Sequence, residues 1–154
     1  MADYQAVAAA RERECRIQAR AYSIWLSALQ PANIVLKVGA AVLSAVAGAA
    51  VLAGKAGNVP GCLALASAVF TVIHTRLDCD VHQAECRRLR SAYDAQAYRY
   101  RSLRDLGEPA ELHGGVSELD TSLASIRAEA KANAPNWAVD RATRRELATA
   151  VIQP

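Results

Sequence analysis

The sequence predicts an all-α membrane protein, in which a two-helix transmembrane hairpin is flanked by a cytosolic N-terminal helix and by C-terminal helices. The first observation is a gap in charge, because Lys55 is the only charged residue between Lys37 and Arg76. The second is composition: 53% of the residues are hydrophobic, yet Phe and Met occur once each. Alanine and glycine are abundant instead, and such small side chains let helices approach closely in lipid.

Four segments follow from the pattern of charge and of helix breakers. We expect a cytosolic helix in residues 1–30, the hairpin in 31–76, a long helix continuing from the second span in 77–107, and cytosolic helices in 108–154. The total charge is +3, too small and too dispersed to indicate direct nucleic acid binding.

The first helix is expected over residues 3–29, where apolar residues recur at three- and four-residue spacing among arginines. Tyr22 and Trp25 precede Pro31, at the place where a helix entering a bilayer carries amphipathic rings. Pro31 lacks a backbone donor and is suited to the first turn of a helix, so it predicts a break and a restart.

Two uncharged runs form the predicted hairpin. Val38–Gly54 contains seventeen uncharged residues and Ala56–Thr75 contains twenty, each long enough to cross the apolar part of a bilayer. Residues 54–61 hold three glycines and a proline, which predicts the turn. Basic residues gather outside the two outer ends, so the positive-inside rule predicts that both termini of this multi-pass protein are cytoplasmic.

The C-terminal part is predicted to hold three helices. The first runs over residues 76–106 and continues from the second span. A loop is expected at residues 113–115, then a helix from an N-cap at Ser117 to about residue 132. Residues 133–135 break the chain, and the last helix covers residues 136–152.

A polar stripe on the second span is the candidate for a water-filled path. Its members are spaced four, three and four residues apart, so they share one helix face. In an oligomer this face would line a pore. The alternative is that the two hydroxyls bond to backbone carbonyls while the ionisable pair lies at the interface. The stripe consists of Ser67, Thr71, His74 and Asp78.

Small residues on the first span are candidates for helix packing. Two stripes with four-residue spacing allow close contact in lipid, one of them against the second span and the other against a neighbouring subunit. The first stripe is Ala40, Ser44 and Gly48, and the second is Ala41, Ala45, Ala49 and Ala53.

No cofactor, metal or catalytic site is predicted. The four cysteines show no disulfide framework and are typical of reduced thiols. Cys79, His82 and Cys86 share one helix face, but a single straight helix rarely supplies the four ligands of a zinc ion. The basic run 87–90 is expected to be a solvated face, with contact to anionic headgroups as the alternative. No motif typical of catalysis occurs.

The layout resembles the SLATT family, the two-transmembrane effector domains associated with SMODS and SLOG systems in prokaryotic conflict operons. The resemblance covers residues 4–145. It is carried by Tyr22-Ser-Ile-Trp25, by the two Ala/Gly-rich spans, by His82-Gln-Ala-Glu-Cys-Arg-Arg-Leu89 and by the tail from Ile126 to Pro135 with Trp137. It implies a homo-oligomeric effector that forms pores in antiviral defence, beside a sensor such as a nucleotidyltransferase or, in some operons, a reverse transcriptase.

Three functional readings follow. The first is a pore-forming effector that oligomerises in the lipid bilayer and permeabilises it. The second is a membrane-anchored assembly module, whose hairpin tethers helices that recruit a partner. The third is a water-soluble, alanine-rich helical bundle.

Overall fold

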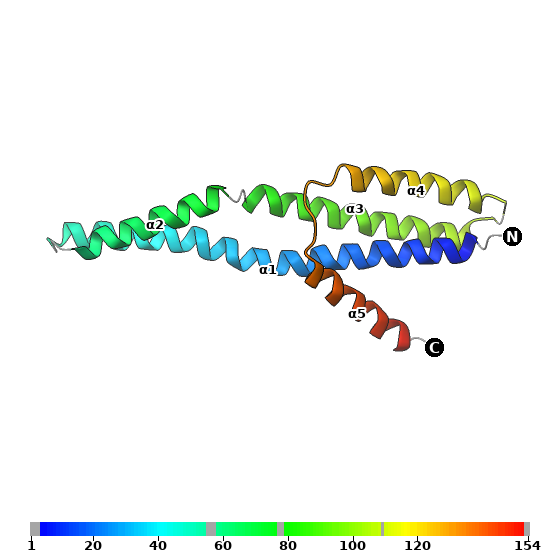
Figure 1. The fold of residues 1–154 in the computed structure, drawn as a ribbon, viewed down its shortest axis with the longest axis horizontal. Helices are drawn as coiled ribbons and strands as arrows, with labels where there is room; N and C mark the ends of the chain where they lie inside the picture. The colour runs from blue at the N-terminus through cyan, green and yellow to red at the C-terminus, as the bar shows by residue number, and fades with distance from the viewer. Residues whose placement is uncertain (1–3, 55–57, 77–78, 109, 153–154) are drawn as a thin grey trace. The chain divides into compact units, whose positions relative to one another are not determined.

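The chain folds into α-helices throughout the part that the structure describes. This computed structural model describes the backbone of residues 4–54, 58–76, 79–108 and 110–152, and these ranges contain no strand. The predicted all-α fold class is confirmed. The helices, traced in Figure 1, are α1 (Tyr4–Leu52), α2 (Asn58–Arg76), α3 (Cys79–Leu106), α4 (Leu112–Ala128) and α5 (Asn136–Ile152).

These helices belong to two compact units. The bundle unit comprises Met1–Leu26 and Ala84–Pro154, and the hairpin unit comprises Ser27–Gln83. α1 contributes residues to both units. α3 also changes unit, at Ala84 instead of the expected residue 77. The predicted continuity between the second span and α3 falls on residues 77–78, which lie outside the described residues.

The core of the bundle unit contains the largest buried side chains. Leu89 and Tyr100 of α3 and Leu123 of α4 are almost completely buried. Cys15 of α1 and Cys86 of α3 lie among the buried residues as free thiols. Burial raises the pKa of Cys15 to about 12, so this thiol is protonated at neutral pH and serves as a small apolar side chain.

Tyr22 lies in this core and not at a membrane surface, contrary to the expectation from its position before Pro31. Its side chain is 3% exposed, and its ring stacks on Tyr93 with the centroids 5.9 Å apart. The Tyr22 hydroxyl donates a hydrogen bond to the Ala132 carbonyl at 2.9 Å. The ring therefore fills the bundle, and its polar end is satisfied by the segment that joins α4 to α5.

The predicted break at Pro31 is wrong, because α1 continues through it to Leu52. A proline removes one helical hydrogen bond and crowds the preceding turn, at a cost of about 3 kcal/mol. The Gln83 side-chain amide supplies a donor close to this point, to the Leu29 carbonyl at 3.2 Å. Residues of α1 are buried on both sides of Pro31, and this packing offsets the local cost.

The turn of the hairpin is shorter than residues 54–61. α1 is followed by a turn at Ala53 and Gly54, and Gly54 adopts a positive φ of 68°. α2 begins at Asn58, so Pro60 lies inside its first turn. A proline is accommodated there because the first backbone donors of a helix have no internal acceptor.

The loop predicted at residues 113–115 and the N-cap predicted at Ser117 are wrong. α4 begins at Leu112, and the Gly115 amide donates to the Glu111 carbonyl at 2.9 Å. A β-carbon at residue 115 would lie 2.7 Å from Leu103 Cδ1. Gly115 therefore allows close contact between α3 and α4. The sequence suggested a loop at this glycine, but its role is helix packing.

The end of the chain agrees more closely with the prediction. α4 ends at Ala128, four residues before the expected end, and residues 130–135 form the break that Pro135 indicated. α5 covers Asn136–Ile152 as predicted. Trp137 packs edge-on against Trp25 of α1, with the ring centroids 5.8 Å apart.

Candidate functional site

The hairpin unit is held together by a narrow strip of contact between α1 and α2. The α1 side includes Gly39 and Ala47, and the α2 side includes Ser67 and Phe70. A β-carbon at Gly39 would lie 3.4 Å from the Phe70 ring. The glycine therefore allows the only phenylalanine of the chain to approach the backbone of α1.

The opposite surface of the hairpin is covered by large apolar side chains. These residues are 39–90% exposed, and only 6% of the most apolar 18-residue stretch of α1 is buried. A water-soluble protein rarely exposes so many large aliphatic side chains in one region. The exposed residues are Ile34, Val35, Val38, Val42, Val46, Val51 and Leu52 of α1, and Val59, Leu65, Val69, Val72 and Ile73 of α2.

Among the described helices, α1 is long and apolar enough to cross a membrane. α2 contains a shorter apolar stretch, Asn58–Ile73. Length and composition alone support this assignment, and the near absence of burial distinguishes the α1 stretch from the core helix of a soluble protein.

The polar stripe of α2 is described only in its first half. The buried Ser67 hydroxyl donates to the Ala40 carbonyl of α1 at 2.8 Å. Thr71 is exposed and donates to the Ser67 carbonyl one turn earlier, at 3.0 Å. The His74 side chain and the whole of Asp78 lie outside the described residues. The assignment of this stripe to a pore stays a prediction.

The small-residue stripes lie mostly outside the contact with α2. Ala40 is half-buried, but the remaining members of both stripes are exposed. Leu36, Gly39 and Leu43 of α1 are also half-buried, and Ala47 is buried. The exposed small residues are Ala41, Ser44, Ala45, Gly48, Ala49 and Ala53.

A polar cluster lies at the open end of the hairpin unit and was missed by the sequence analysis. Lys37 contacts both carboxylate oxygens of Asp80, at 2.9 and 2.7 Å. The Asn33 side-chain amide donates to the same carboxylate at 2.9 Å. The sequence did contain a signal for this pair, because Lys37 and Asp80 carry opposite charges and lie just outside the two apolar runs. This cluster ties α1 to the start of α3 within the hairpin unit.

The face of α3 that carries His82 and Cys86 is divided between the two units. Cys86 is fully buried in the bundle unit and His82 belongs to the hairpin unit, while the Cys79 side chain lies outside the described residues. Within the described part of the chain, no three His, Cys, Asp or Glu residues are grouped as a metal site requires.

The basic run that follows on α3 is partly structural. Leu89 lies in the core. Arg88 donates two hydrogen bonds to Glu85, both at 2.8 Å, and the backbone amide of Lys131 donates to the same carboxylate at 3.2 Å. These bonds lower the pKa of Glu85 to about 2, and the bonds from the Arg88 guanidinium have the largest effect. Glu85 thus links α3 to the segment between α4 and α5.

Comparisons with protein families, with curated proteins and with solved structures give no match to this chain.

Proposed function

We propose that this protein is a pore-forming membrane effector of a prokaryotic defence system. In this proposal the hairpin unit enters the inner membrane, and copies of the chain associate and permeabilise it when a sensor partner triggers them. The observation that carries the proposal is the apolar outer surface of the hairpin, which exposes twelve large aliphatic side chains. The role in defence rests on the resemblance to the SLATT family.

The dimensions of the hairpin support insertion. At 1.5 Å per residue, Ile34–Leu52 extends about 28 Å and Asn58–Ile73 about 24 Å. The hydrocarbon core of a bilayer is about 30 Å thick. Transfer of exposed valine and leucine side chains from water to lipid lowers the free energy of the system. A helical hairpin also satisfies its backbone hydrogen bonds internally, as a membrane requires.

The composition of the bundle unit supports the topology. This unit contains residues from before and after the hairpin, Met1–Leu26 and Ala84–Pro154. Both outer ends of the hairpin must therefore return to the same side of any membrane that it enters. Basic residues outside those ends, against Lys55 alone between the spans, make that side the cytoplasm.

The exposed small residues of α1 support association between copies. Ser44 and Gly48 are not used in the contact with α2, and four-residue spacing of small side chains favours close packing of helices in lipid. A second hairpin is the partner that fits this face.

One observation favours the alternative function, a membrane-anchored assembly module. The hydroxyls of Ser67 and Thr71 both donate to carbonyls inside the hairpin. These two groups therefore need no water, and a hairpin that only anchors the bundle unit would show the same bonds.

Ion flux distinguishes the two functions. The purified full chain is inserted into vesicles of phosphatidylethanolamine and phosphatidylglycerol loaded with K⁺, and K⁺ efflux is recorded. A pore predicts efflux that falls about tenfold or more with Thr71→Leu and His74→Leu together, because polar groups lining the path are lost. Val72→Leu, a lipid-facing control, keeps the efflux.

The other outcomes are equally informative. Inserted protein that gives no efflux even after the sensor partner is added favours the anchor. Equal efflux from wild type and the double variant means that the pore face is wrongly assigned. Recovery of the chain in the supernatant without detergent contradicts both functions and favours a soluble bundle.

A further inference from the structure

The bundle unit carries a groove between α1, α3 and α5 that is lined by arginines. Three cavities of about 200, 220 and 360 Å³ adjoin there, and Arg16 lines all of them. Six arginines and three carboxylates face these cavities, so the groove holds an excess of positive charge. The arginines are Arg13, Arg16, Arg20, Arg90, Arg101 and Arg104.

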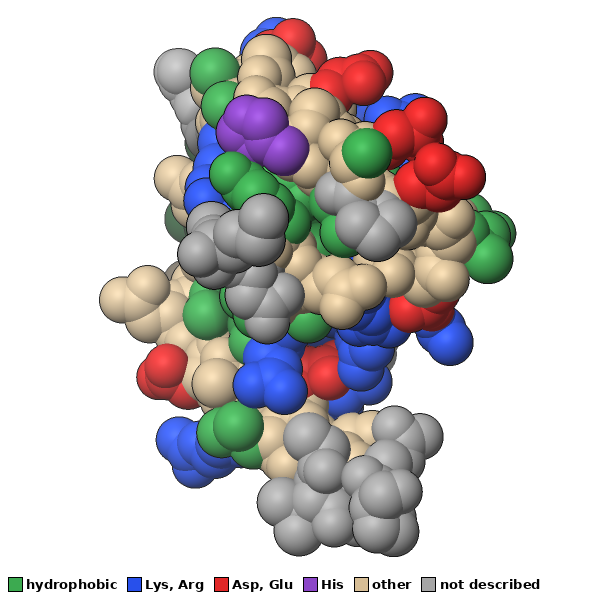
Figure 2. Space-filling view, turned by 90° about the vertical axis from the view of Figure 1, so that its right-hand side faces the viewer, with side chains coloured by type: hydrophobic (Ala, Val, Ile, Leu, Met, Phe, Trp, Pro, Cys, Tyr) green, Lys and Arg blue, Asp and Glu red, His purple; other side chains and the backbone are tan. Residues whose placement is uncertain are grey.

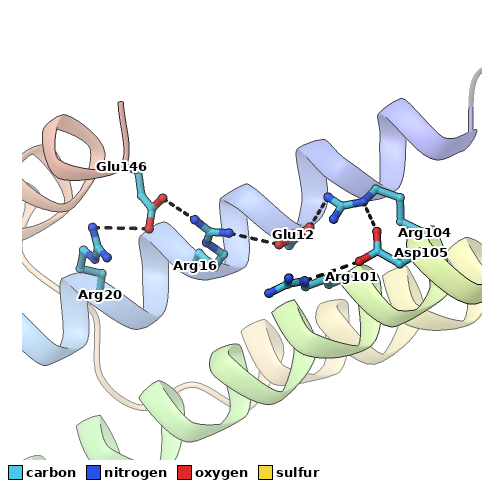
Figure 3. A network of polar contacts seen from close by, with 7 residues as sticks. All are labelled: Glu12, Arg16, Arg20, Arg101, Arg104, Asp105 and Glu146. Atoms are coloured by element: carbon cyan, nitrogen blue, oxygen red, sulfur yellow. Dashed lines mark hydrogen bonds and ion pairs between the residues drawn. The ribbon is translucent and has the colours of Figure 1, made fainter. Parts of the chain in front are cut away.

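Two buried carboxylates hold this cluster in place. The Glu12 and Glu146 side chains are only 6% and 7% exposed. Arg16 bridges them, at 3.2 Å from Glu12 and 2.9 Å from Glu146. Arg20 lies 3.5 Å from Glu146, and Arg104 pairs with Glu12. Figure 3 shows the guanidinium groups of α1 aligned along these acids.

The arginines keep donors for a further anion. Each guanidinium has five N–H donors, and Arg16 and Arg20 remain 45% and 38% exposed. Arg13 has no ion pair within the described part of the chain. Arg101 contacts Asp105 only at 3.5 Å. The ion pairs hold the guanidinium groups in position and leave some of their donors unused. Because the groups are already positioned, less conformational entropy is lost when an anion binds.

We propose that this groove binds a soluble anion with several linked phosphates, with Arg13, Arg16 and Arg20 as its main ligands. The planar guanidinium fork matches two phosphate oxygens at once. Several phosphates suit the excess of positive charge better than the single phosphate of a lipid headgroup. The proposal does not depend on the hairpin entering a membrane.

Binding at this groove is linked to α5. Glu146 of α5 accepts a hydrogen bond from Arg16 and forms an ion pair with Arg20, two of the arginines that would hold the phosphates. Anion and carboxylate therefore compete for Arg16 and Arg20, and Glu146→Gln is expected to tighten binding. Figure 2 shows one face of the molecule, on which Lys and Arg side chains gather in the lower half and Asp and Glu side chains gather at the upper right.

The test is calorimetric titration of the full chain in neutral detergent with tripolyphosphate. Arg13→Gln removes a groove charge without breaking an ion pair and is expected to weaken binding about fivefold, or about 1 kcal/mol. Arg16→Gln is expected to weaken it about tenfold or more. Arg99→Gln is the matched control, because Arg99 lies on α3, is exposed and does not line the groove.

Three outcomes would overturn the proposal. Wild-type protein that does not bind tripolyphosphate at low salt shows that the arginines serve only the ion pairs. Equal weakening by Arg13→Gln and Arg99→Gln shows attraction to net charge without a site. Tighter binding of soluble dihexanoylphosphatidylglycerol than of tripolyphosphate assigns the groove to a lipid headgroup.

Discussion

The bundle unit and the hairpin unit distribute large and small side chains in opposite ways. The bundle unit buries Leu89, Tyr100 and Leu123. Within the two apolar runs of the hairpin unit the buried residues include the small Ala47 and Ser67, while the large valines are exposed. Burial of large apolar groups stabilises a fold in water, and the reverse arrangement is stable only where the surroundings are apolar. This difference supports the proposal that the hairpin unit enters lipid while the bundle unit stays in water.

α1 shows this difference within one helix. Its residues 11–20 carry four arginines and two glutamates, and after Arg20 the next charged residue is Lys37. The buried acids of the bundle unit are paired with arginine, as a buried charge requires. The hairpin unit instead places its charged pair, Lys37 and Asp80, at the open end. One continuous helix thus combines a charged segment and an uncharged segment.

The largest expected effect comes from charge on the outward valines. Val42→Arg with Val46→Arg should cost about 6 kcal/mol of membrane insertion, since each arginine near the middle of a span costs about 3 kcal/mol. Leu106→Arg with Leu147→Arg, at exposed sites of the bundle unit, should leave insertion unchanged. Flotation of vesicles with bound protein measures both. Equal loss in the two pairs would mean that the units do not differ in solvent.

Truncation in the bundle core should have the next largest effect. Leu123→Ala should lower the free energy of unfolding by about 3 kcal/mol, because it removes buried methyl groups and leaves a cavity. Leu65→Ala in the hairpin unit, where the side chain is exposed, should change it by less than about 0.5 kcal/mol. Thermal unfolding of the full chain in detergent, followed by near-ultraviolet circular dichroism, measures the difference. A cost at Leu65 as large as at Leu123 would contradict the comparison.

The smallest expected effect is a pH dependence confined to the bundle unit. The pKa of Glu85 falls from its ordinary 4.5 to about 2 in the folded chain. Its stabilisation is therefore complete above about pH 4.5 and is lost as the pH falls toward 2. Glu85→Gln should cost about 1 kcal/mol at pH 7 and progressively less below pH 4.5. A constant difference between wild type and variant from pH 7 to pH 3 would show that Glu85 does not hold this charge-dependent link.

The local pattern of the sequence predicted the outline of both units but not their contacts. The break at residues 133–135 predicted the start of α5 correctly, because a proline break is a local property. Gly115 misled the prediction, since its role depends on Leu103 of another helix. The approach of Phe70 to Gly39 was not predicted either, because it depends on a residue of another helix. Glu146 and Arg16 are separated by 130 positions, and periodicity carries no signal for such pairs.

The divided bundle unit also fixes an order of events during synthesis of the chain. Residues 1–26 leave the ribosome before the hairpin, and Ala84–Pro154 leave after it. Cys15 and Tyr22 therefore have no α3 neighbours to pack against while the apolar runs are being synthesised. Glu146 is made 130 residues after Arg16, so this pair can close only after the whole hairpin has been synthesised. Completion of the bundle is thus a later step than synthesis of the hairpin.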